Sequence, residues 1–211
     1  MKIIHRNSTA LWSRTLANIS LALCFICTPC LHASEVSEAY GRDEAAMWRA
    51  YYEGRWLDLA TRTAGLAQQQ FGVGAEDAIR LSGHAAKAAM LFRKDGTDPE
   101  VTSALEQLYT IVRDAGHRNF DPAEAARLEL QWWRERREGK SPEQYAPTIA
   151  RAVALVFGSD AEKMQPAALL RARAMAYRDE RRDGRMTEAD WQEVARQLAK
   201  AREAMEAGLA P

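Results

Sequence analysis

The chain has 211 residues, of which 47% are hydrophobic and 27% are charged, so it can form one domain with a substantial core or two small ones. Its 29 basic and 29 acidic residues give a formal net charge of +0. This balance excludes a strong overall field that would attract the protein to nucleic acid or to an anionic membrane.

The segment from Met1 to Ala33 has the features of a secretory signal peptide. Basic residues and no acidic ones accompany the apolar run LANISLALCFI (16–26), and the break TPCLHA leads to Ala33. The run is shorter than the roughly 20 residues that a membrane span requires. We therefore expect cleavage after Ala33 and a periplasmic or secreted protein, with a retained anchor as the alternative.

Cys24, Cys27 and Cys30 have a CxxCxxC spacing that could suggest a metal or cluster site. All three lie in the predicted leader, so we expect them to be removed with it. The remaining chain then has no thiol nucleophile and no disulfide, and packing alone must stabilise it.

Glycines punctuate the chain after the leader, each following a run that is compatible with a helix. Glycine is expected just past a helix end because it adopts the left-handed conformation without a steric clash. Helix-start signals follow several of these glycines. The glycines are Gly54, Gly72, Gly96, Gly116, Gly139, Gly158, Gly184 and Gly208. The start signals are Asp98-Pro99, Asp121-Pro122, Ser141-Pro142, Ser159…Glu162 and Thr187…Asp190.

Alternate glycines, such as Gly54, Gly96 and Gly139, recur at intervals of roughly 40 residues. Two helices per repeat at this period are typical of an array of α-hairpins. No segment shows the alternation of a β-strand. The sequence therefore predicts a single all-α domain over 34–211, with about eight helices in four antiparallel hairpins, either solenoid-like or a bundle.

The first helices of the four predicted hairpins can be aligned from Ala45, Ala85, Ala125 and Leu170. In each helix the residue five positions after this start is apolar, and the residue seven positions after this start is aromatic. These positions share one face of a helix, so we expect the aromatic residues to pack between neighbouring hairpins. The aromatic residues are Tyr52, Phe92, Trp132 and Tyr177.

Trp133 departs from this pattern. The aligned position holds charged residues in the other three hairpins, Glu53, Arg93 and Arg178. One interpretation is an exposed aromatic anchor for a partner, a role in which tryptophan is enriched. The alternative is packing under the following hairpin.

Charged residues also stand where the pattern requires small ones. Arg49 and Glu129 align with Ala89 and Ala174, and Arg136 lies on the same line of its helix as Glu129. Burying such groups without partners costs several kcal/mol, so they are either paired between helices or exposed to a groove that binds a partner. We therefore take Arg49, Glu129 and Arg136, with Tyr52 and Trp133, as candidate binding residues.

The stretch YYEGRWLDLA (51–60) resembles the turn of a tetratricopeptide hairpin at Tyr51, Gly54, Trp56 and Ala60. The resemblance covers about ten residues, and that family's period is 34. It implies a superhelix of helical hairpins that binds a protein or peptide.

We predict a non-enzymatic interaction module that binds a protein or peptide in the cell envelope. The alternative is a carrier or sensor of a small ligand, with a pocket lined by Tyr52, Phe92 and Trp132. We expect no cofactor and no metal, since His84, and His117 beside Asp114, lack the further ligands that a metal site needs. No catalytic constellation supports an enzyme.

Overall fold

The computed structural model describes residues 28–94, 96–181 and 186–210 and, within them, eight helices and no strand. The prediction of an all-α fold with about eight helices is confirmed. The helices are α1 (Thr28–Tyr52), α2 (Trp56–Phe71), α3 (Ala75–Arg93), α4 (Asp98–Ala115), α5 (Pro122–Arg137), α6 (Pro142–Phe157), α7 (Ala161–Asp179) and α8 (Glu188–Leu209).

The predicted leader lies outside the described residues up to position 27, which includes Cys24 and Cys27, and its last residues form the start of α1. The cleavage site after Ala33 stays a prediction. Within the described residues, no helix combines the length and the apolar character that crossing a membrane requires.

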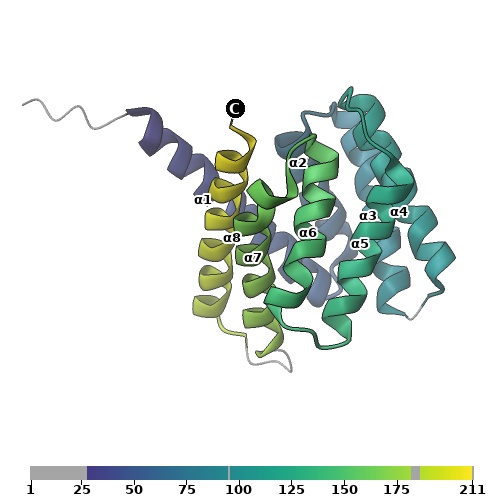
Figure 1. Cartoon of the computed structure of the whole chain (residues 1–211). Coiled ribbons are helices and arrows are strands. Elements are labelled where there is room, and N and C mark those ends of the chain that lie inside the picture. The colour runs from purple at the N-terminus through teal and green to yellow at the C-terminus, as the bar shows by residue number, and fades with distance from the viewer. Residues whose placement is uncertain (1–27, 95, 182–185, 211) are drawn as a thin grey trace, which may run out of the picture.

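Consecutive helices pack against each other in antiparallel pairs, and α1 also packs along α8 (Figure 1). The first and last helices of an open superhelix do not touch, whereas here their contact closes the chain into a ring. Of the two predicted arrangements, solenoid-like or bundle, the structure therefore has the bundle. The superhelix that the tetratricopeptide resemblance implied is replaced by this closed form.

Gly41 makes the contact between α1 and α8 possible. A Cβ atom added at this position would lie 2.4 Å from the carbonyl oxygen of Ala195 and 2.7 Å from the amide nitrogen of Ala199. Both neighbours are backbone atoms of α8, which cannot move aside as a flexible side chain can. The absence of a side chain at Gly41 thus allows the two helices to approach closely enough to close the ring.

The predicted helix ends are mostly confirmed. Gly54, Gly72, Gly139 and Gly158 have positive φ angles just past α1, α2, α5 and α6. After α4 the left-handed residue is His117, with φ 49°, rather than Gly116. Residue Gly184 lies outside the described residues.

Two boundary predictions are wrong. Gly208 lies inside α8, where it does not end a helix but admits close packing, since a Cβ there would meet the carbonyl oxygen of Lys163. Helix α7 is capped by Asp160 rather than by Ser159, because the Asp160 side chain accepts a hydrogen bond from the Glu162 amide at 2.8 Å. The capping box at Thr187 and Asp190 is present as predicted.

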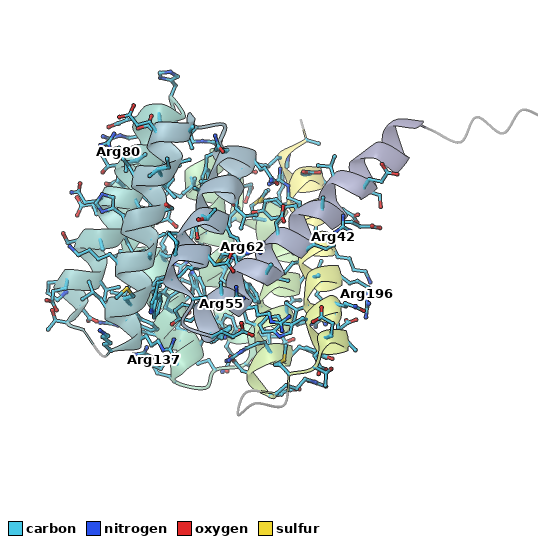
Figure 2. The ribbon with its side chains drawn as sticks, turned by 180° about the vertical axis from the view of Figure 1, so that it is seen from behind. Arg42, Arg55, Arg62, Arg80, Arg137 and Arg196 are labelled. Carbon is cyan, nitrogen blue, oxygen red and sulfur yellow. The ribbon has the colours of Figure 1, made fainter. Side chains whose placement is uncertain are left out.

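Charged side chains on the outer surface pair mainly within their own helices. Figure 2 shows arginines of this kind on the outer faces of α1, α2, α3 and α8. Each has an acidic partner three or four residues away on its own helix, an arrangement worth a few tenths of a kcal/mol. The pairs are Arg42–Glu38, Arg62–Asp58, Arg80–Asp77 and Arg196–Glu193.

Candidate functional site

Two adjoining cavities, of about 230 Å³ and about 250 Å³, occupy the centre of the ring. All eight helices contribute to the walls of the first, which we call the aliphatic chamber. Its lining includes Leu66, Ile149, Val153, Met164, Leu198 and Met205. The second is the aromatic chamber, whose rings come from α1, α3, α4 and α5. These rings are Trp48, Tyr51, Tyr52, Phe92, Tyr109, Trp132 and Trp133.

The two chambers share a set of lining residues, which we call the waist. These residues are Met47, Thr63, Leu108, Tyr109, Glu129, Trp132 and Arg171. The waist also joins the two apolar clusters of the core, since Trp132 belongs to one and Tyr109 to the other. Tyr109, Glu129 and Arg171 thus place polar and charged groups where the two chambers meet.

Glu129 is the centre of a hydrogen-bond network at the waist. Its Oε2 accepts from the Tyr109 hydroxyl at 3.1 Å and from Trp132 Nε1 at 2.9 Å. Its Oε1 accepts from Trp133 Nε1 at 2.9 Å. Burial, followed by the charge of Glu129, raises the pKa of Tyr109 well above its usual value, so this hydroxyl remains a donor.

Arg171 on α7 forms an ion pair with Glu44 on α1. The Glu44 side chain is only 4% exposed, so the pair provides the compensation that a buried carboxylate requires. Arg171 keeps 31% of its side chain accessible, and because it lines both chambers this surface faces the cavities. Burial opposes its charge, but Glu44, Tyr40 and Glu129 outweigh that effect and raise the pKa of Arg171.

Arg136 lies at the far side of the aromatic chamber, near the end of α5. It donates two hydrogen bonds of 2.7 Å to the carboxylate of Asp179 on α7 and one of 2.7 Å to the Tyr52 hydroxyl on α1. Burial disfavours its charge, yet Tyr52 and Asp179 together raise the pKa of Arg136. This group links three helices around one end of the chamber.

The structure brings four of the five predicted binding residues together. Glu129, Trp133, Arg136 and Tyr52 all line the aromatic chamber. Arg49 does not, because it pairs with Glu53 at 2.8 Å and with Glu188 at 2.9 Å on the surface between α1 and α8. Whether any of the five binds a ligand or a partner stays a prediction.

Trp133 is half-buried, and its indole ring points inward. Its ring centroid lies 5.1 Å from that of Phe92 and 6.0 Å from that of Trp132. The indole nitrogen is hydrogen-bonded to Glu129. The ring is therefore packed within the fold, and its closest aromatic neighbour outside α5 is Phe92 of the preceding hairpin rather than a ring of the following one, under which the alternative interpretation placed it.

Three of the four aligned aromatic residues face the interior. Tyr52, Phe92 and Trp132 line the aromatic chamber. Tyr177 instead donates a hydrogen bond of 2.8 Å to Asp190 on α8 and lies under the guanidinium of Arg181. The pattern therefore marks an inward-facing position in three hairpins and a contact with the last helix in the fourth.

No family of proteins, no curated protein and no solved structure matches this chain. Functional inference therefore depends on the geometry of the site.

Three polar residues at or beside the waist, Arg171, Glu44 and Tyr109, were not predicted from the sequence. Arg171 stands where the other aligned helices have alanine, at Ala46, Ala86 and Ala126, so the same comparison that identified Glu129 could have found it. Glu44 and Tyr109 lie outside the aligned segments, and no pattern in the sequence marks them.

The site is suited to binding. Among the described residues, no group of three or more histidine, cysteine or acidic side chains could hold a metal ion. The waist offers hydrogen-bonding groups, one ion pair and accessible aromatic surface, which are the elements of a pocket for a small molecule.

Proposed function

We propose that this protein binds a small organic molecule in its central cavity. The observation that carries the proposal is a pair of adjoining cavities, lined together by side chains of all eight helices, with Tyr109, Glu129 and Arg171 where they meet. Ligand sites commonly combine an apolar cavity with a few placed polar groups. A protein whose only task was stability would gain by filling such space, since empty apolar volume in a core is destabilising.

The alternative, a module that binds a protein or peptide partner, depends mainly on Trp133 as an exposed anchor. The inward position of this side chain, on Glu129 and against Phe92, favours the small-molecule proposal. The charged groups of the outer surface are largely paired with their own neighbours, which gives the interaction module no comparable support.

A neutral dye whose fluorescence increases in apolar surroundings, N-phenyl-1-naphthylamine, tests the proposal. We expect saturable binding that weakens at least about tenfold when Ala89→Phe fills the aromatic chamber or Ala152→Phe fills the aliphatic one. Ala123→Phe on the exposed face of α5 is the matched control and should bind as wild type does. Dye binding that neither filled variant weakens would contradict the proposal.

We further propose that the protein acts outside the cytoplasm after removal of the leader. The basic, apolar and small-residue segments that end at Ala33 support this. Mass spectrometry of the protein purified from cells should give a chain that begins at Ser34. A mass that includes the segment from Met1 to Ala33 would contradict cleavage.

A further inference from the structure

We propose that the aromatic chamber binds an organic cation, a protonated or quaternary amine on an apolar body, with Glu129 as its counter-ion. This inference rests on the proposed function, of which it names the ligand class. It combines three features of the chamber: an acidic group with no ion pair among the residues that the structure describes, a wall of aromatic rings, and basic groups that are already paired.

Glu129 is the acidic group of the chamber that has no ion pair of its own among the described residues. Its hydrogen-bond donors are a hydroxyl and two indole N–H groups, all neutral. Within the described residues it forms no salt bridge, and Arg171, which attracts it electrostatically, has its ion pair with Glu44. A carboxylate has about four lone-pair sites, so three donors leave one for a ligand.

The two basic side chains that line the chamber each have an acidic partner, although Arg136 shares Asp179 with Arg178. Arg136 is held by two hydrogen bonds to Asp179, and Arg171 by Glu44. A ligand anion would have to displace these internal carboxylates or compete with Glu129 across a small cavity. A ligand cation can pair with Glu129 without displacing any internal ion pair. Binding a cation therefore costs less free energy than binding an anion in this chamber.

The aromatic walls favour the same class of ligand. The face of an aromatic ring is negative, and rings gathered around a cavity bind ammonium groups that have lost their water. Four rings of this chamber, Trp48, Tyr51, Tyr52 and Phe92, already have a guanidinium of the protein within 6 Å of the centroid, at 3.2 Å in the case of Arg178 over Tyr52. Among the described residues the rings of Tyr109, Trp132 and Trp133, which donate to Glu129, have no such contact, so these are the rings that face a ligand cation. A quaternary ammonium is weakly hydrated, so it enters such a site at a smaller desolvation cost than a primary amine does.

Phenyltrimethylammonium and tert-butylbenzene provide the decisive comparison. They have nearly the same shape, and only the first is charged. Isothermal titration of the full-length protein at pH 7 should give at least about tenfold tighter binding for the cation, the preference expected from a counter-ion and desolvated cation–π contacts. The anion 4-tert-butylbenzoate completes the series and should bind more weakly than either.

Glu129→Gln keeps the size and a hydrogen-bond acceptor while it removes the charge. We expect this variant to lose the preference for the cation and to bind tert-butylbenzene as wild type does. Glu188→Gln, at an exposed carboxylate on α8, is the matched control and should keep the preference. The comparison of the three ligands in the wild-type protein stands even where Glu129→Gln folds poorly.

The outcomes separate this inference from the proposed function. Equal or tighter binding of the neutral compound, or preference for the anion, would overturn the cation proposal while the cavity remained a binding site. A cation preference that survives in Glu129→Gln would overturn the role of Glu129. Failure of all three compounds and of the naphthylamine dye to bind would overturn both proposals.

Discussion

The two chambers of the cavity differ in how their walls are built. The aliphatic chamber is lined mainly by apolar side chains, among them Leu, Val, Ile and Met, and by polar pairs such as Tyr40 with Gln70 (2.8 Å). Both chambers share the Glu129 carboxylate with its donors Tyr109 and Trp132, but only the aromatic chamber adds a second indole donor, Trp133, and the rings near the C-terminal ends of α1 and α3. The apolar faces of the helices line both chambers. Residues that depart from the aligned pattern, such as Glu129 and Trp133, lie in the aromatic chamber, which is the one suited to binding a ligand.

Arg171 lines both chambers at the waist. Breaking its ion pair with Glu44 should have the largest effect on the free energy of unfolding. Arg171→Met leaves Glu44 buried without a partner, and we expect a loss of about 3–5 kcal/mol in the free energy of unfolding, measured in urea. The double variant Arg171→Met/Glu44→Leu should recover most of this loss. A single variant as stable as wild type would show that buried Glu44 does not depend on Arg171 for compensation.

Closure of the ring can be tested next, at a site that lines neither chamber. Gly41→Ala places a Cβ against the backbone of α8, and we expect a loss of about 2 kcal/mol with weaker dye binding in both chambers.

Gly65→Ala is the matched control for this substitution, because an added Cβ there meets nothing within 4 Å. Since Gly65 lies inside α2, the alanine should stabilise the protein by up to about 1 kcal/mol. Equal effects of the two substitutions would contradict the role of Gly41 in closure.

Alkaline pH should destabilise the whole ring. Burial raises the pKa of Tyr145 to about 12, and it also raises the pKa values of Tyr40 beside the aliphatic chamber and Tyr109 at the waist. The folded state retains these protons better than the unfolded chain, so their stabilising contribution is complete below pH 10. It is lost as the pH rises through the folded-state pKa values.

Urea unfolding at intervals between pH 9 and pH 12, with tyrosinate absorbance followed in parallel, checks this dependence. The free energy of unfolding should decline continuously above pH 10. A stability that stays constant to pH 12 would contradict it.

We expect the smallest effect on stability from a substitution at Trp133, which lines the aromatic chamber and not the aliphatic one. Trp133→Phe keeps an aromatic ring against Phe92 but removes one donor to Glu129, and we expect a loss of about 1 kcal/mol in stability. Trp191→Phe, at a buried tryptophan that lines neither chamber, is the control for ring size. Phenyltrimethylammonium affinity should change in the first variant and stay unchanged in the second.

Much of the local structure could be predicted from the sequence because its causes lie within a few residues. Glycines after helices, the capping residues and the 3.6-residue periodicity act locally, and they predicted eight helices with most of their ends. The errors at Gly208 and Ser159 occurred where a distant helix or a neighbouring aspartate determined the outcome.

The candidate site was found only in part, for the same reason. Glu129, Trp133, Arg136 and Tyr52 attracted notice as features of an aligned repeat, and they meet in one chamber. Arg49 had the same kind of signal, yet it lies at the surface, since a periodic pattern places a residue on a helix face but not within the assembled ring.

The sequence by itself determined that this chain forms helices, where most of them start and end, and which positions depart from the apolar pattern. Only the tertiary structure decided that α1 meets α8 and that the chambers adjoin around Glu129. Ring closure depends on backbone atoms of the first and the last helix, at Gly41 and Ala195, which are far apart in the sequence. Such contacts follow from the packing of all the helices together, and local preferences do not encode them.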